Sequence, residues 1–308
     1  MKKLSCILLS LLLLVMLFAG CQGKTPAPAE ESEAPQTTLA VDTEGTEPGD
    51  KETLPPKRPL EERFAEVKCE VLARTVVPAE TVKLYGGGSA ENATVLTLRL
   101  LFPDWDTQSD CGNLRILDPE GSEPAQNVNG WTNRLDGNPI CANVYLAILD
   151  GDVEAAGLRV VLKEAYGYTE AEIPMEAGSG EGVYEALHEA FPTKVVRAQG
   201  RTYFVTNTGA WSTNGETLDR SIILTPLEGG FDHTLDKAGV TIEGPSATSD
   251  AVTLYVNEYE EVDHRNDTFT EQAITVVLRD SEKFGDYFKN AAICIDDGTG
   301  NPARIYFN

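Results

Sequence analysis

Apolar residues recur with a period of two along most of the chain, and this alternation limits what the chain can fold into more than any other feature. In "ATVLTLRLLF", Leu96, Leu98 and Leu100 share one face of an extended chain, whereas Thr97 and Arg99 lie on the other. Successive side chains of a strand point to opposite faces of its sheet, so this spacing predicts β-strands. Similar runs, separated by clusters of Gly, Pro, Asn and Asp, continue almost to the C-terminus. The pattern indicates an all-β protein of antiparallel strands, because a parallel sheet would need helices between its strands.

Two short stretches break the alternation with helical spacing. Val183 and Leu187 are four residues apart within 181–191, and Phe284 and Phe288 are four apart in "SEKFGDYFKN". Apolar residues at this spacing fall on one face of a helix. We therefore expect one or two short helices among the strands.

The length of the strand-rich region suffices for two domains. We expect two antiparallel β-sandwiches of the immunoglobulin-like kind, an inference from the strand pattern alone. The first would occupy residues 63–170 and the second residues 193–308. The first helix would then lie in a connecting segment, residues 171–192.

The first twenty residues have the composition of a secretory leader. Lys2 and Lys3 are followed by an almost unbroken apolar run that ends at Phe18. The run is shorter than the roughly 20 apolar residues that a spanning helix needs, so a retained transmembrane helix is the weaker interpretation. We expect residues 1–20 to be removed as a signal peptide.

The residues at the end of this leader add a second constraint. The junction Ala19-Gly20-Cys21 resembles the lipobox of bacterial lipoproteins, with Phe18 where that family usually has Leu. The resemblance covers the leader and Cys21 only. It implies that the leader is cut before Cys21, that this cysteine is lipidated, and that the acyl chains anchor the protein to the cell membrane on its extracytoplasmic face.

The segment that follows Cys21 has the composition of a disordered linker. Residues 22–62 contain seven prolines, ten acidic and four basic residues, and no aromatic residue. Such a segment buries too little apolar surface to offset the entropy of ordering. We expect residues 21–62 to be the lipidated cysteine and an acidic, Pro-rich tether.

The charge of the chain excludes one class of partner. There are 25 Lys and Arg against 49 Asp and Glu, a net charge of −24, and the basic residues form no cluster. Nucleic acid is therefore not an expected partner, because binding to phosphate needs clustered basic residues. The expected partners are the membrane, through the lipid anchor, and an extracytoplasmic protein or glycan.

Four cysteines remain beyond Cys21, and they permit disulfides outside the cytoplasm with three possible pairings. Cys111 and Cys141 lie in the turn-like stretches "SDCGN" and "NPICAN", so a bridge between them is the first choice. Cys69 and Cys294 lie in strand-like runs and are expected to be buried thiols.

Motifs for catalysis are missing from the sequence. His233 and His264 follow acidic residues in loops, and His188 falls on an expected helix. None has the neighbouring nucleophile or metal-ligand spacing of a known catalytic motif. We expect no enzymatic activity, no catalytic residue and no cofactor.

One acidic loop is a candidate calcium site. Asp104, Asp106 and Asp110 bring several hard oxygen ligands together in "PDWDTQSDCGN". The pattern of an EF-hand fails, because Ser109 and Arg115 stand where that motif has Gly and Glu. The alternative is a solvated acidic loop.

The three tryptophans are the candidate binding residues. Trp105, Trp131 and Trp211 all lie in polar, turn-forming surroundings. An indole beside Asn, Asp and Thr can stack on a sugar ring and hydrogen-bond its hydroxyls. The alternative is that each indole plugs one end of a sandwich core, since tryptophan is usually largely buried.

Together these features predict a membrane-anchored extracytoplasmic lipoprotein that acts as a binding module for a protein partner or a glycan. A structural protein of envelope assembly is the first alternative, and a hydrolytic enzyme comes last.

Overall fold

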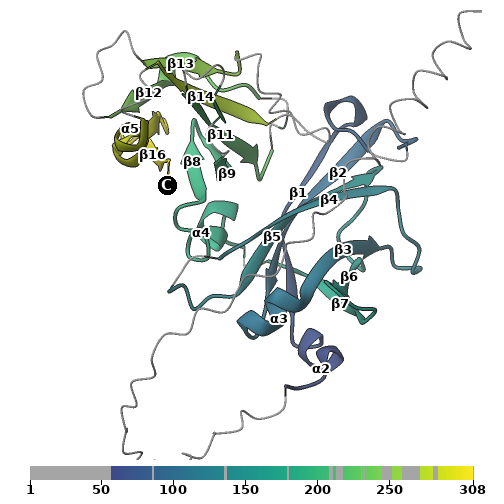
Figure 1. Ribbon diagram of the computed structural model, residues 1–308. Helices are drawn as coiled ribbons and strands as arrows, with labels where there is room; N and C mark the ends of the chain where they lie inside the picture. Colours follow the sequence, from purple (N-terminus) through teal and green to yellow (C-terminus); the bar gives the residue numbers. More distant parts are fainter. Residues whose placement is uncertain are drawn as a thin grey trace, which may run out of the picture. The chain divides into compact units, whose positions relative to one another are not determined.

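Figure 1 shows the computed structural model of the protein. It describes residues 57–84, 87–134, 137–178, 180–207, 211–212, 218–229, 231, 233–244, 252–258, 271–279 and 284–307. The leader, Cys21, residues 22–56 of the expected tether and His264 lie outside the described residues. Within the described part of the chain, no helix has the length and apolar content needed to cross a bilayer.

Strands make up most of the regular structure. They are β1 (Lys68–Pro78), β2 (Asn92–Leu101), β3 (Cys111–Leu117), β4 (Gln126–Thr132), β5 (Ala142–Asp150), β6 (Arg159–Glu164), β7 (Glu170–Ala177), β8 (Val195–Ala198), β9 (Arg201–Asn207), β10 (Trp211–Ser212), β11 (Leu218–Pro226), β12 (Val240–Glu243), β13 (Val252–Val256), β14 (Gln272–Leu278), β15 (Ala292–Ile295) and β16 (Ala303–Tyr306). The α-helices are α2 (Leu60–Phe64), α3 (Trp105–Asp110), α4 (Val183–His188) and α5 (Phe284–Asn290), and short 3-10 turns lie at Ala79–Thr81 and Lys237–Gly239.

The predicted β-rich class is confirmed, and so are the two predicted helices, as α4 and α5. The helices α2 and α3 were not predicted. α2 begins at Leu60, inside the expected tether, and it buries Arg63 and Phe64. The folded part of the chain therefore starts before residue 63.

The first sheet has seven strands in the order β3-β6-β7-β1-β2-β5-β4, all antiparallel except for the pair of β7 with β1. Its central strands β2 and β5 are buried on both faces. In β5, Tyr145 and Leu149 pack into one core, whereas Val144 and Leu146 pack into another. This double burial explains why "NVYLAIL" is an almost continuous apolar run.

This sheet curls until its two edge strands lie next to each other. The side-chain amide of Gln126, the first residue of β4, accepts from the Ile116 N–H of β3 at 2.8 Å and donates to the Ile116 carbonyl at 3.0 Å. The strands are traced in Figure 1, where β3, β6 and β7 curve away from β1, β2 and β5. The result is a nearly closed barrel, and the expected immunoglobulin-like sandwich in residues 63–170 is not confirmed.

The C-terminal half contains two further sheets. One has the order β13-β14-β11-β9-β8 with β10 added to β11, and the other has the order β12-β15-β16. Their shared core includes Tyr203, Ile222, Ile293 and Phe307. The two sheets thus share one core, and the immunoglobulin-like sandwich expected for residues 193–308 is not confirmed.

A third core joins the two halves. It combines Val95 and Val144 of the first sheet with Leu187 of α4 and with Phe204 and Leu227 of the second half. The Thr97 hydroxyl of β2 also donates to the Leu227 carbonyl. The segment expected to be a connection, residues 171–192, is therefore part of the fold: it contributes most of β7 to the first sheet and α4 to the shared core.

Candidate functional site

The seam between β3 and β4 is where the curled sheet leaves an opening. The two strands are joined by the turn at residues 118–125 and run antiparallel, and they diverge beyond the bond between Gln126 and Ile116. Within the described residues, β3 pairs only with β6, and β4 pairs only with β5. A cleft of about 480 Å³ opens between them, lined by Cys111, Gly112, Asn113, Leu114, Arg115, Glu123, Gln126, Val128, Gly130, Thr132, Asn143 and Tyr145.

Gly130 sets the shape of this cleft. It is the cross-strand neighbour of Tyr145 on β5, and a Cβ atom at Gly130 would lie 2.2 Å from Cε1 of the tyrosine ring. Only glycine allows the ring to lie against the backbone of β4 at this point. The ring closes the cleft toward the core, and the absent side chain leaves the strand edge accessible.

A buried polar network forms the floor of the cleft. Gln108 of α3 donates to the Asn143 side chain at 2.7 Å, and Asn143 in turn donates to the Tyr145 hydroxyl at 3.0 Å. Burial raises the pKa of Tyr145, and it raises the pKa of the Cys111 thiol to about 11 against the opposing effect of a hydrogen bond with Tyr145. At neutral pH both groups are uncharged donors, so the floor of the cleft is polar but carries no charge.

The rim of the cleft carries charge. Arg115 pairs with Glu123 at 3.3 Å and with Glu170 at 2.8 Å. All three side chains are well exposed, so the pairs add little stability. They leave one positive and two negative charges at the mouth of the cleft.

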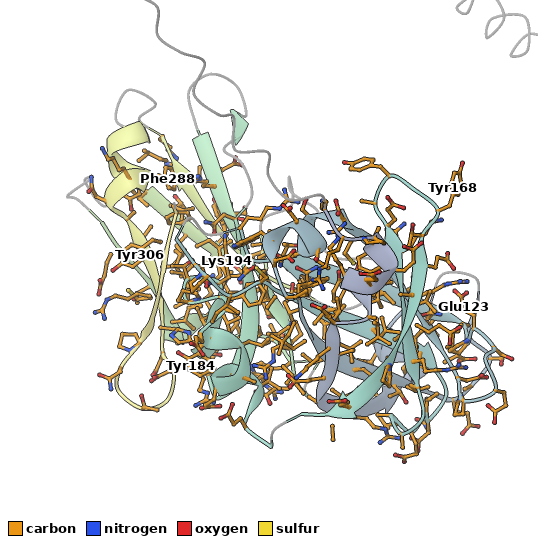
Figure 2. All side chains as sticks on the ribbon, turned by 90° about the horizontal axis from the view of Figure 1, so that it is seen from below. Glu123, Tyr168, Tyr184, Lys194, Phe288 and Tyr306 are labelled. Carbon is orange, nitrogen blue, oxygen red and sulfur yellow. The ribbon has the colours of Figure 1, made fainter. Side chains whose placement is uncertain are left out.

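The turn between β6 and β7 adjoins the cleft and carries two fully exposed tyrosines. Tyr166 and Tyr168 have exposed fractions of 101% and 98%. Figure 2 shows Tyr168 projecting away from the ribbon. We call this turn, residues 165–168, the tyrosine tip.

The tyrosine tip has a defined geometry. Ala165 N–H donates to the Asp110 carbonyl at 2.8 Å, and Glu164 N–H donates to the Thr169 carbonyl at 2.9 Å. The Glu164 carboxylate folds over Gly167, where a Cβ would lie 2.0 Å from its oxygen. These contacts define the backbone of the turn, from which both tyrosine side chains project into solvent.

A hollow of about 440 Å³ lies beside the tip. It is lined by Gly112 and Asn113 of β3, by Lys163 and Glu164 of β6, and by the tip itself. Since Gly112 and Asn113 also line the cleft at the seam, the hollow and the cleft adjoin. Aromatic faces, hydrogen-bond donors and acceptors thus meet on one surface.

The structure does not gather the three tryptophans into one platform. Trp105 on α3 is 38% exposed, and α3 ends at Asp110, next to the tyrosine tip. Trp131 stacks on Phe204 in the core between the halves, with ring centroids 4.8 Å apart. Trp211 begins β10, and its side chain lies outside the described residues. Trp131 is thus partly buried against the shared core and also lines a shallow hollow, whereas Trp105 is exposed.

The calcium site proposed from the sequence is not formed. Asp104 is the N-cap of α3 and accepts from the Thr107 N–H at 2.7 Å, and Asp110 accepts from Arg63 at 2.6 Å. Partial burial would raise the pKa of both carboxyls, but these hydrogen bonds lower it. Two of the three acids are thus already bonded, Asp106 is exposed, and the described residues contain no group of His, Cys, Asp and Glu side chains that could hold a metal ion.

The cysteines beyond Cys21 are all free in the structure. The predicted bridge between Cys111 and Cys141 is therefore not formed: Cys111 lies beside Tyr145, and the Cys141 thiol contacts the Pro139 carbonyl at 3.9 Å. Cys69 and Cys294 are buried in strands, as predicted.

The histidine on α4 has a packing role. The ring of His188 stacks on Tyr184 with centroids 4.8 Å apart, and its Nδ1 lies 3.3 Å from the Val195 carbonyl.

Neither the tyrosine tip nor the cleft is predicted by the patterns considered in the sequence. The signal for the tip was present as "EAYGYTE", two tyrosines flanking a glycine directly after a strand-like run. A scan against protein-family models and a search of curated proteins gave no match.

Proposed function

We propose that this protein is a bacterial lipoprotein, lipidated at Cys21 and held on the extracytoplasmic face of the cell membrane, that binds a cell-envelope glycan at the tyrosine tip. The observation that carries the binding proposal is the complete exposure of Tyr166 and Tyr168 on a hydrogen-bonded turn. Exposing two neighbouring aromatic side chains to water is unfavourable, and this exposure supports a role in binding.

The groups around the tip fit a sugar. A sugar ring presents a C–H face, which stacks on an aromatic ring, and a rim of hydroxyl groups, which need both donors and acceptors. Asn113, Lys163 and Glu164 in the adjoining hollow supply both kinds. This is the combination that the sequence suggested for the tryptophans, transferred to a different set of aromatic residues.

The binding proposal is tested with insoluble peptidoglycan and a panel of immobilised oligosaccharides as probes. In the mature chain carrying Cys21→Ser, the double variant Tyr166→Ala/Tyr168→Ala should bind at least ten times more weakly than the parent, because each exposed aromatic anchor contributes about 1–3 kcal/mol. Its melting temperature should be unchanged, since both side chains are already in water.

Tyr306 provides the matched control. It is 55% exposed on β16, outside the proposed site, and Tyr306→Ala should leave glycan binding unchanged. Equal binding by the parent and the double variant, or an equal loss in Tyr306→Ala, would refute the assignment of the site.

The anchoring proposal rests on the lipobox resemblance and is tested separately. Expressed in a bacterium, the full chain should incorporate labelled fatty acid and partition into detergent. Cys21→Ser should abolish the label while leaving Cys6 of the leader in place as an internal control. A label that survives the substitution would contradict lipidation at Cys21.

A further inference from the structure

The cleft at the seam has two walls that are strand edges, and the hydrogen-bonding direction of each edge can be derived. In β4, Asn133 N–H donates to the Ala142 carbonyl, and Asp150 N–H of β5 donates to the Ala125 carbonyl. Backbone groups of an antiparallel strand alternate between its two sides. Odd-numbered residues of β4 therefore face β5, and the even-numbered ones, Val128, Gly130 and Thr132, direct their N–H and C=O groups into the seam.

The same alternation applies to β3. Ile116 uses both its N–H and its C=O on the Gln126 side chain, so its backbone faces the seam. Leu114, two residues earlier, then faces the seam as well. Two edges with available donors and acceptors thus stand on opposite sides of one cleft.

Gln126 shows what kind of group fits between these edges. Its side chain is a primary amide, chemically close to a peptide group, and it makes with Ile116 the same pair of hydrogen bonds that a residue of a neighbouring strand would make. The narrow end of the seam is therefore already filled by an amide. The wider end, between Leu114 and Gly130, offers the same backbone chemistry, and among the described residues no strand pairs with the seam side of either edge.

We propose that this seam binds an extended polypeptide segment of a partner protein by β-strand addition, with the segment lying between β3 and β4 and completing the barrel. Because β3 and β4 run antiparallel to each other, the added strand must be parallel to one and antiparallel to the other. Its side chains would alternate between the cleft floor at Tyr145 and the solvent. Small side chains fit the inward positions, because the ring of Tyr145 lies against Gly130 there.

Charge at the rim restricts the partner further. Arg115, Glu123 and Glu170 together carry one positive and two negative charges. The outward-facing side chains of the segment lie beside this rim. A segment with Lys or Arg at an outward position is therefore complementary to it, whereas an acidic segment such as the protein's own tether is not.

The test uses a phage-displayed library of linear twelve-residue peptides as the probe, selected against the mature chain carrying Cys21→Ser. Peptides that bind the parent should bind Thr132→Ala with the same affinity and Thr132→Pro with an affinity at least ten times lower. The proline removes only an N–H that faces the seam, and proline is tolerated in an edge strand on that side. Because successive residues of an inserted strand bond alternately to β3 and to β4, N-methylation should weaken binding at each position along the paired part of a selected peptide.

Hydrogen exchange locates the site independently of whether the proline variant folds. The amides of Leu114, Val128 and Gly130 should exchange quickly in the free protein and become protected when the peptide is bound. Three results would overturn the proposal. They are protection of amides in the tyrosine tip alone, equal peptide affinity for the parent and for Thr132→Pro, and a library that yields no binding peptide. Protection of the seam on concentrating the protein alone would also overturn it, because the occupant would then be a second copy.

The two proposals fail separately. Tyr166→Ala/Tyr168→Ala should abolish glycan binding while leaving protection of the seam by the selected peptide intact. Thr132→Pro should weaken peptide binding at the seam while leaving glycan binding intact.

Discussion

At the scale of single residues, the contact between Gly130 and Tyr145 decides whether the cleft exists. Glycine inside a strand normally costs about 0.5–1 kcal/mol relative to alanine, so Gly130→Ala would stabilise an ordinary strand. Here the added methyl group meets the tyrosine ring. We expect Gly130→Ala to lower the free energy of unfolding by about 1–3 kcal/mol, the usual cost of overpacking.

A second substitution should reverse the sign of the effect of Gly130→Ala on the free energy of unfolding. Tyr145→Val removes the ring atoms Cδ1 and Cε1 that the methyl group would meet. In that background, Gly130→Ala should be neutral or stabilising, as measured by urea unfolding of all four members of the cycle. If Gly130→Ala lowers the free energy of unfolding equally in the parent and in Tyr145→Val, the ring does not lie against Gly130.

The Cys111 thiol, which also lines the cleft, should make the free energy of unfolding decrease at alkaline pH. Burial raises its pKa from 9.0 to about 11, so the folded state holds the proton more tightly than the unfolded state does. The resulting stabilisation is complete below pH 9 and is lost as the pH rises from 9 through 11. Between pH 8 and 10.5, the parent should lose about 2 kcal/mol more of its unfolding free energy than Cys111→Ala. Thr132→Ala, which keeps the thiol, should behave like the parent.

At the scale of elements, α4 is held to the first sheet by one partly buried arginine. Arg99 of β2 bonds Glu70 of β1 at 2.7 Å and also donates to the Ala186 carbonyl near the end of α4. Its side chain is only 16% exposed. Arg99→Leu should lower the free energy of unfolding by about 2–3 kcal/mol, because charge-assisted bonds at a partly buried site are lost.

A second arginine that contacts α4, Arg197 of β8, serves as the control. Arg197 pairs with Glu185 at 2.9 Å and lies over the Tyr184 ring, but its side chain is 45% exposed. Arg197→Leu should cost about 1 kcal/mol or less, since solvent screens the pair. Equal effects of the two substitutions in urea unfolding would contradict the anchoring role of Arg99.

The elements that sequence analysis found and those that it missed differ in a physical way. β2 and β5 have both faces in a core, so their apolar residues gave a strong signal. β4 reads "QNVNGWT" because one side of it opens into a cleft, and only Val128 and Trp131 mark it as a strand. In β7 the exposed glutamates and Pro174 hid the strand, and Pro174 lies just outside the three residue pairs that join β7 to β1.

The candidate site was missed for the same reason. The cleft is made by the strands with the weakest patterns, and its existence depends on β3 and β4 meeting around the curled sheet, which no local pattern encodes. The acids of "PDWDTQSD" resemble metal ligands in the sequence, but in the structure Asp104 caps α3. The spacing from Asp104 to Thr107 fits a helix start, and that signal was available in the sequence.

At the scale of the whole folded unit, the shared core makes the two halves one cooperative structure. Phe204 and Leu227 from the second half pack with Val95 and Val144 from the first, and the stacked pair of Trp131 and Phe204 crosses between them. Separating the halves would expose this entire surface to water. Residues 57–308 should therefore unfold in a single transition, although their length would allow two independent domains.

Two buried thiols on either side of the shared core can test this cooperativity. Cys69 lies in the barrel core and is 0% exposed, and Cys294 lies in β15 of the second half and is 3% exposed. Burial raises the pKa of both thiols, that of Cys69 to about 12, so neither should react with a thiol reagent at pH 8 until it is exposed by unfolding. If the halves unfold together, the modification rates of Cys69 and Cys294 should rise with urea along the same curve, as followed by mass spectrometry of peptides from the mature chain carrying Cys21→Ser. Phe204→Ala should shift both curves together. Two separate curves, or a shift of the Cys294 curve alone in Phe204→Ala, would show that the halves are independent domains that merely touch.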